Sequence, residues 1–144
     1  MSHYDTFNDV LVNLFREIQD IEEKALTASE FKDISGNDMH ILEAIGNQEP
    51  RNMSSVAASL NVTVGTLTIA VNNLVKKGYV TRQRSDTDRR VVLLSLSEKG
   101  LAAFLHHQRF HEEMVQALVA DMDPEEIQAL ERALRKLRCF FRNR

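Results

Sequence analysis

Several residue types that shape other protein classes are scarce in this sequence. Its 144 residues include no tryptophan, one cysteine, two prolines and five glycines. The single thiol, Cys139, cannot support an internal disulfide framework, which predicts a cytoplasmic protein. No apolar run reaches the roughly 18 residues that a membrane-spanning helix needs, so we expect no membrane partner. The N-terminus has no basic segment before an apolar core, and we therefore expect no signal peptide.

Catalytic motifs are absent as well. The sequence contains no glycine-rich phosphate loop, no nucleophile elbow and no paired carboxylates beyond ordinary helix charge. We therefore predict that the protein is not an enzyme and needs no cofactor. A protein-interaction scaffold is the alternative to a nucleic-acid-binding protein, but it would leave the basic hairpin described below unexplained.

Charge is distributed unevenly along the chain. The formal net charge is −3. Between Met53 and Arg90 there are six basic residues and only two acidic ones, Asp86 and Asp88, so this segment carries +4 and the remainder −7. A basic segment inside an acidic chain predicts a patch that binds an anionic partner.

Both ends of the chain carry apolar residues at alternating spacings of three and four, which is typical of helices with a narrow apolar seam. The first helix is expected over about 5–26. The last should begin at Asp123, with Pro124 at its first position and Glu126 completing a capping box. Packing within one chain would bury these seams, but two terminal seams around a basic middle favour a homodimer. The seam positions are Phe7, Leu11, Leu14, Ile18, Ile21 and Ala25, then Ile127, Leu130, Leu134, Leu137 and Phe141.

The middle of the chain predicts three short helices and a β-hairpin. The helices are expected over residues 37–46, 52–61 and 63–78, with caps at Asn52 and Thr63. A further helix should follow the hairpin, over about 97–121. Two short helices followed at once by a hairpin predict a winged helix-turn-helix. The expected fold is mainly α with a small β-hairpin, in one domain over 1–144, with the winged helix-turn-helix at about 37–97 and dimerisation helices at about 5–26 and 98–142.

The tip of the hairpin, within the stretch TRQRSDTDRRVVLLSLSEKG (81–100), carries adjacent arginines. In a winged helix this tip extends along the duplex toward phosphates and the minor groove, where positive charge is needed. Asp88 can aim the guanidinium of Arg90 through a charge-assisted hydrogen bond. A solvated turn would explain a lone Asp-Arg-Arg, but the preceding helix-turn-helix favours DNA. The expected contacts are Arg82, Arg84, Asp88, Arg89 and Arg90.

The helix expected over 63–78 is the candidate recognition helix. It has no arginine or lysine before Lys76, although arginine is the usual partner of guanine. It offers hydroxyls, methyls and amides instead, which suit thymine and adenine and predict an A·T-rich operator on double-stranded DNA. The residues expected to face the DNA groove are Thr63, Val64, Gly65, Thr66, Thr68, Ile69, Asn72, Asn73 and Lys76, with Gly65 allowing close approach of the backbone.

These residues resemble the MarR family of bacterial transcription regulators. The stretch SDTDRRVVLLSLSEKG is similar to the family's wing signature, an Asp-x-Arg followed by a Leu-x-Leu strand and a helix starting near Lys-Gly. VAASLNVTVGTLTIAVNNLVKKGYV is similar to the family's helix-turn-helix. The resemblance implies a homodimer with two winged helices, usually a repressor on a palindromic operator. It assigns Arg90 as the wing arginine and Asp88 as its support.

Shorter stretches resemble the repressors of fatty-acid biosynthesis genes within this family. They are FKDIS (31–35), TLTIAVNNLVKKGYV (66–80) and RFHEEMV (109–115). This resemblance implies a co-repressor, a long-chain acyl group on acyl carrier protein, bound between the dimerisation helices and the DNA-binding part. The apolar candidates for its pocket, each of which could equally be plain core, are Phe15, Phe31, Ile34, Met39, Leu42, Phe104 and Phe110.

A zinc-responsive repressor of the same family is the alternative. His107 and His111 lie four residues apart on one helix face, a workable spacing for zinc ligands. His40 stands on a helix expected to pack nearby, and Glu22 or Glu23 could add an oxygen ligand. Two histidines on a polar helix face also occur without a metal. For Cys139 we expect a buried, inert thiol in the last helix rather than a redox switch.

Overall fold

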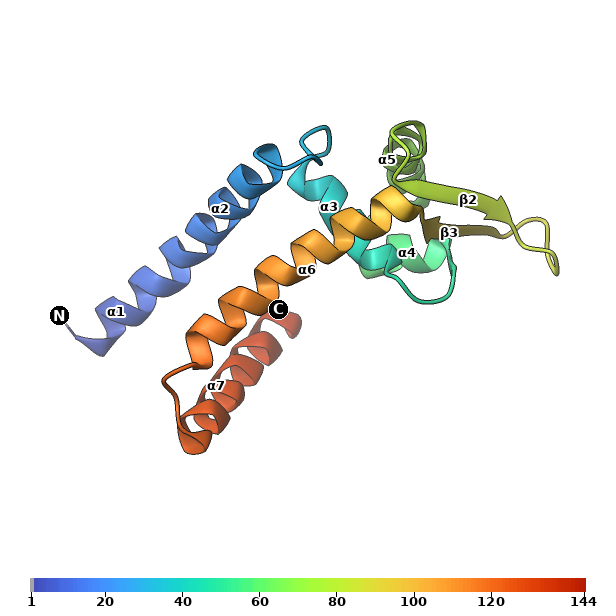
Figure 1. Ribbon diagram of the computed structural model, residues 1–144. Helices are drawn as coiled ribbons and strands as arrows, with labels where there is room; N and C mark the ends of the chain where they lie inside the picture. Colours follow the sequence, from blue (N-terminus) through green and yellow to red (C-terminus); the bar gives the residue numbers. More distant parts are fainter. Residues whose placement is uncertain (1) are drawn as a thin grey trace. The chain divides into compact units, whose positions relative to one another are not determined.

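The computed structural model describes residues 2–144 (Figure 1). It divides into two compact units, the first ending at His107 and the second comprising Gln108–Arg144. The boundary falls inside a continuous helix, α6 (Glu98–Val119), and not in a linker. The organisation as a single domain stays a prediction. Within the described residues, no single helix is long and apolar enough to cross a membrane.

The first unit begins with a helical segment, His3 to Thr27, that contains one irregular turn. Helix α1 (His3–Asp9) is capped by Ser2, and α2 (Phe15–Thr27) follows it. Between them, η1 (Val10–Leu14) is a π-helix, whose wider turn shifts the residues that follow around the helix axis. The regular apolar seam expected here is therefore interrupted. The apolar side chains around it, from Tyr4 to Phe15, are largely exposed in the single chain.

The helix-turn-helix follows from local capping signals. Helices α3 (Gly36–Ile45), α4 (Met53–Ser59) and α5 (Val64–Lys76) begin after Ser35, Asn52 and Thr63, and each of these side chains accepts a hydrogen bond from a backbone N–H of the first turn. The segments Met53–Leu60 and Val64–Lys76 are bent by 107°, which lies in the range of helix-turn-helix motifs. Asn61 makes the bend with a φ of 56°, a left-handed conformation that asparagine tolerates.

A three-stranded antiparallel sheet completes this unit, where the sequence had predicted only a hairpin. Strand β2 (Val80–Arg84) pairs with β3 (Val92–Leu96), with Val80 opposite Leu96 and Arg84 opposite Val92. The added strand β1 (Arg51–Asn52) pairs with the other edge of β3, giving the order β1-β3-β2. We call β2, β3 and the loop between them the wing. Its base is therefore held against the start of α4.

The hydrophobic core lies in the first unit, between the helix-turn-helix, the base of the wing and the start of α6. Leu42, Val56, Val71, Leu74 and Leu94 are fully enclosed. Among residues 2–144, no polar or charged residue is buried to the same degree. The remaining core members are Leu26, Phe31, Ile34, Met39, Ile41, Ile45, Met53, Ala57, Leu67, Tyr79, Val80 and Ala103.

Tyr79 joins the end of α5 to the start of α6. Its ring is buried, and its hydroxyl donates a hydrogen bond of 2.5 Å to the Asp33 carboxylate. Burial and this carboxylate raise the pKa of the Tyr79 hydroxyl, and the hydrogen bond lowers the pKa of Asp33. The Tyr79 carbonyl accepts from the Ser97 N–H at 3.0 Å, and a Cβ on Gly100 would lie only 1.9 Å from that carbonyl oxygen. Only glycine at position 100 lets α6 pack this close.

The second unit contains the end of α6 and helix α7 (Pro124–Arg142). The predicted capping box is confirmed: Asp123 accepts from the Glu126 N–H at 2.9 Å, and Glu126 accepts from the Asp123 N–H at 3.1 Å. The expectation of a buried Cys139 is wrong, because this thiol is exposed. No residue of α7 is buried in the single chain, so this helix offers no enclosed position for the thiol.

Candidate nucleic-acid interface

Helix α5 exposes one side to solvent while Leu67, Val71 and Leu74 anchor the other in the core. The predicted DNA-contacting residues Thr63, Val64, Gly65, Thr66, Ile69, Asn73 and Lys76 are all exposed, and Thr68 is half-buried. Ile69 is the most prominent apolar residue, with 68% of its surface exposed. Val64 on the same helix is 45% exposed, so the solvent-facing side of α5 is partly apolar.

The hydroxyl groups of α5 are largely committed to the helix itself. Thr63 accepts from the Thr66 N–H at 3.1 Å and donates to the Thr66 hydroxyl at 2.9 Å. Thr68 donates its hydroxyl hydrogen to the Val64 carbonyl at 2.7 Å. A base edge would therefore meet acceptor lone pairs and methyl groups at Thr63 and Thr68, while the Thr66 hydroxyl, which accepts from Thr63, keeps its hydrogen for donation. Gly65 adds open space, since a Cβ there would touch only the Thr63 hydroxyl, at 3.9 Å.

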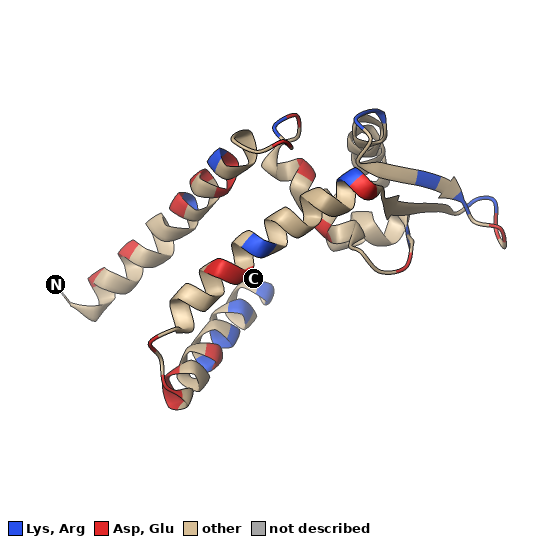
Figure 2. Cartoon of the chain, viewed as in Figure 1, with Lys and Arg blue, Asp and Glu red and all other residues tan. Residues whose placement is uncertain are grey.

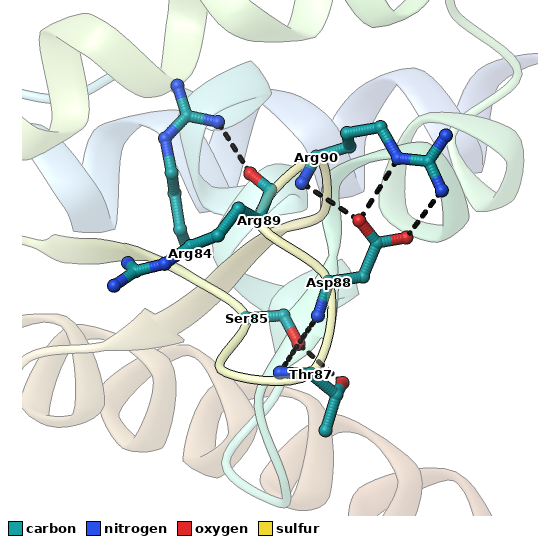
Figure 3. A network of polar contacts seen from close by, with 6 residues as sticks. All are labelled: Arg84, Ser85, Thr87, Asp88, Arg89 and Arg90. Atoms are coloured by element: carbon teal, nitrogen blue, oxygen red, sulfur yellow. Dashed lines mark hydrogen bonds and ion pairs between the residues drawn. The ribbon is translucent and has the colours of Figure 1, made fainter.

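The wing tip is organised around Asp88 (Figure 3). Its carboxylate accepts hydrogen bonds from the Arg90 backbone N–H at 3.0 Å, from Nε at 3.1 Å and from a terminal guanidinium nitrogen at 3.2 Å. These bonds lower the pKa of Asp88. The Arg90 side chain is nevertheless 91% exposed. The predicted contact is confirmed, and it leaves the outer face of the guanidinium open.

A second set of bonds shapes the same loop. The Arg84 guanidinium donates to the Arg89 carbonyl at 2.8 Å, across the mouth of the hairpin (Figure 3). At the turn, the Ser85 hydroxyl accepts from the backbone N–H groups of Thr87 and Asp88 at 3.3 and 3.4 Å. The arginines at the tip are therefore carried on a loop with a defined shape. Figure 2 shows the basic residues on β2 and on the loop.

A groove of about 580 Å³, open to solvent, lies between helix α5 and the wing. Val64 and Thr68 line it from α5, while Arg82, Arg84 and Arg90 line it from the wing. Arg82 and Arg84 share one face of β2 because side chains alternate along a strand. Three guanidinium groups and no acidic side chain line this groove, which suits an anionic chain. The other lining residues are Asn52, Met53, Ser54, Val91 and Val92.

The sequence patterns did not identify some of the residues in and around this site. Asn52 and Ser54 line the groove, yet the sequence marked Asn52 only as a helix cap. Arg51 lies just before the basic segment 53–90. Its guanidinium donates to the Ala44 carbonyl and, at 2.8 Å, to the Ser55 hydroxyl. Asn72, expected to face the bases, accepts a hydrogen bond from Arg82. The pairing of β1 with β3 brings Asn52 and Ser54 to the groove, and no local sequence pattern predicts that pairing.

The residues predicted to bind an acyl chain occupy different environments. Phe31, Ile34, Met39 and Leu42 belong to the core of the first unit. Phe15 is 57% exposed, while Phe104 and Phe110 on α6 are half-buried. Their role as a pocket stays a prediction.

The histidines of the alternative zinc site lie on α3 and α6. The Glu43 carboxylate is 2.5 Å from Nε2 of His107 and 3.7 Å from Nδ1 of His40. His107 is 11% exposed, and the hydrogen bond to Glu43 raises its pKa. His111 follows one turn later on α6. An ion pair between Glu43 and a protonated His107 accounts for this contact without a metal.

Comparison with solved structures gives the same fold. The chain is similar to Streptococcus pneumoniae FabT, whose structure is of a complex with DNA, with 41% identity, a TM-score of 0.90 and coverage of 97% of this chain and 98% of that one. The Staphylococcus aureus MepR–DNA complex shares the fold, with 21% identity, a TM-score of 0.75 and coverage of 97% and 99%.

Curated relatives and a family profile agree with the structures. The uncharacterised HTH-type regulator YpoP of Bacillus subtilis is 32% identical over 75 residues, 52% of this chain and 53% of that protein. SarZ of Staphylococcus saprophyticus is 42% identical over 60 residues, 42% and 41% of the two chains. The chain spans about half the length of the curated relatives it matches. These relatives are named as transcriptional regulators, which agrees with the prediction that the chain is not an enzyme. Residues 34–92 match the MarR family profile, and the chain belongs to the MarR family of transcriptional regulators.

Proposed function

We propose that the chain is a repressor that binds an A·T-rich palindromic operator through α5 and the wing. The observation that carries this proposal is the groove between them, which three arginines line without an acidic residue. Helix α5 would lie in the major groove and present methyl groups, while Arg90, aimed by Asp88, would enter the adjacent minor groove. The DNA complexes of FabT and MepR show that proteins of this fold bind DNA.

We propose that the functional form is a homodimer. Phe7 on α1 and Phe141 on α7 are 61% and 65% exposed in the single chain, together with many other apolar side chains of both terminal helices. Their charges are opposite: residues 3–27 carry six acidic and two basic side chains, whereas residues 132–144 carry six basic and no acidic ones (Figure 2). Apolar area with opposite charge favours pairing of these helices between two copies.

The dimer is tested by sedimentation. We expect a dimer at micromolar concentration that weakens in high salt, because salt screens the charge attraction between exposed helices. A stable monomer that still binds a palindrome tightly would contradict this arrangement.

We further propose that the regulated genes encode fatty-acid biosynthesis, with a long-chain acyl group on acyl carrier protein as co-repressor. The proposal is supported by the resemblance of the stretches at 31–35, 66–80 and 109–115 to fatty-acid repressors, and by the 41% sequence identity with FabT over 97% of this chain. The zinc-responsive repressor remains the second candidate, because His107 and His111 are four residues apart on α6, a workable spacing for zinc ligands.

One binding experiment separates these candidates. An operator is first selected from random DNA, and its affinity is then measured by fluorescence anisotropy with long-chain acyl carrier protein, with the same carrier lacking an acyl group, and with a chelator. If the protein senses acyl chains, we expect the operator affinity to change with the acylated carrier and to stay the same with the unacylated carrier and with the chelator. For a zinc sensor the chelator would change the affinity, and His107→Ala would abolish that response. Mass spectrometry of the native protein, read for bound acyl chains and zinc, gives an independent check.

A further inference from the structure

Helix α5 and strand β2 are joined by a direct side-chain contact. The guanidinium of Arg82 donates a hydrogen bond from Nη1 to the Oδ1 carbonyl oxygen of Asn72. Both residues are exposed, so burial does not force the contact. It links the recognition helix to the wing across ten residues that include the tight turn at Gly78 and the start of β2.

The contact determines what Asn72 can offer to DNA. Recognition of adenine by asparagine uses both ends of the amide, with the carbonyl accepting from N6 and the amino group donating to N7. The Asn72 carbonyl already accepts from Arg82. Asn72 could make the two-bond adenine contact only by sharing this oxygen between Arg82 and the base, so its exposed position alone does not make it a reader of adenine. Asn73, the next residue, is exposed and stays a predicted DNA contact.

The contact also determines where Arg82 stands. Arg82 lines the groove between α5 and the wing together with Arg84, Val64 and Thr68. A guanidinium carries five N–H donors, so the bond to Asn72 leaves several of them for another acceptor. An arginine held by an amide presents these donors with less loss of conformational freedom on binding than a free side chain does.

The geometry of a duplex indicates which acceptor meets this arginine. The major and minor grooves are separated by one sugar-phosphate strand. With α5 in the major groove and the wing tip in the adjacent minor groove, that strand passes between them, through the groove that Arg82 lines. Phosphate oxygens are there the nearest partners for a planar guanidinium.

We infer that Asn72 is a positioning residue, which holds Arg82 as a clamp on the DNA backbone strand that passes between α5 and the wing. The inference rests on the proposed DNA-binding function and adds a role for two residues within it. It assigns different roles to two adjacent asparagines, because Asn72 acts through Arg82 while Asn73 faces the DNA directly.

Salt dependence tests the clamp. Affinities for the selected operator and for random DNA are measured over a range of salt concentrations, with the wild-type protein, Arg82→Ala and Arg82→Lys. Arg82→Ala removes one phosphate contact in each protomer. The slope of log affinity against log salt, which is negative, should therefore become less steep by about 2 for the dimer, and binding to both DNAs should weaken by about tenfold. Arg82→Lys keeps the charge and should keep most of the slope. Lys32→Gln, which removes an exposed charge outside both the groove and the proposed dimerisation helices, should change neither quantity.

A double-mutant cycle tests the positioning role. Asn72→Ala should weaken binding several-fold in the wild-type background and have little further effect in the Arg82→Ala background, because its function is exerted through Arg82. Asn73→Ala should have the same effect in both backgrounds. Circular dichroism and thermal melting confirm that each variant is folded.

Three results would overturn the inference: an unchanged salt slope in Arg82→Ala, an Asn72→Ala effect that adds fully to that of Arg82→Ala, or a change of base preference in operators selected with Asn72→Ala. The last two would make Asn72 an independent DNA contact. Failure of the wild-type protein to select any operator would contradict the proposed function itself. The two failures are therefore distinguishable.

Discussion

The Asp88 carboxylate holds Arg90 by three hydrogen bonds of 3.0 to 3.2 Å, one from the arginine backbone and two from its guanidinium. The spacing of two residues makes this possible, because the turn places the backbone and the side chain of Arg90 around the same carboxylate (Figure 3). An arginine that is 91% exposed would otherwise sample many rotamers. The aspartate thus reduces the freedom that DNA binding must remove.

Truncation of the wing arginine should weaken DNA binding without changing the fold. We expect Arg90→Ala to cost about 1–3 kcal/mol of operator affinity, the usual range for a well-placed base-edge contact. Asp88→Ala should cause part of the same loss, because it frees the arginine. Helical content should remain that of the wild type by circular dichroism, and Asp86→Ala, which alters the neighbouring acid, is the matched control. Unchanged affinity in Arg90→Ala would mean that the tip is only a solvated turn.

The methyl-rich surface of α5 predicts dependence on thymine methyl groups. Val64, Ile69 and the Thr68 methyl would contact the C5-methyl of thymine, so uracil in the operator, which lacks only that methyl, should weaken binding. We expect thymines under the start of α5, A-tract-like sequences under the wing and half-sites about one helical turn apart. Unchanged affinity on uracil substitution at every major-groove position, or selection of G·C-rich half-sites, would refute this account.

The close approach of α6 to Tyr79 predicts a strong effect at Gly100. A Cβ would lie 1.9 Å from the Tyr79 carbonyl oxygen, a backbone atom that cannot move without disturbing the base of the wing. We expect Gly100→Ala to lower the free energy of unfolding by about 1–3 kcal/mol or more, as overpacking does. Gly65→Ala is the control, because a Cβ there would meet only the Thr63 hydroxyl, at an ordinary contact distance of 3.9 Å, on an exposed helix face. Equal urea midpoints for the two variants would contradict the close packing.

The His107–Glu43 pair predicts a pH-dependent contribution to stability. The hydrogen bond to Glu43 raises the pKa of His107, so the pair contributes fully below the ordinary histidine pKa of about 6.5 and loses its contribution as the pH rises through the raised value. The difference in free energy of unfolding between the wild type and His107→Gln should therefore shrink between about pH 6 and 8. Urea denaturation in the presence of a chelator measures it without metal effects. A difference that grows with pH would rule out the ion pair as its source.

Local sequence determined the helix starts and the wing tip. Asn52, Thr63 and Asp123 cap helices at the predicted positions, because a cap needs only backbone groups within its own first turn. The Asp88–Arg90 contact spans two residues and was predicted for the same reason. The MarR family was recognisable from the wing and the helix-turn-helix, where such local features are dense.

Contacts between distant segments were decided by the tertiary structure alone. Strand β1 has two residues and exists only because β3 offers Leu93 and Leu94 as partners, some forty residues later. The bond of Tyr79 to Asp33 and that of Asn72 to Arg82 likewise join separate elements. Residue type makes such bonds possible, but the packing of the core selects which donor meets which acceptor. Sequence pattern therefore identified α5 and the wing as the DNA-binding elements, and the folded chain decided that Asn72 holds an arginine.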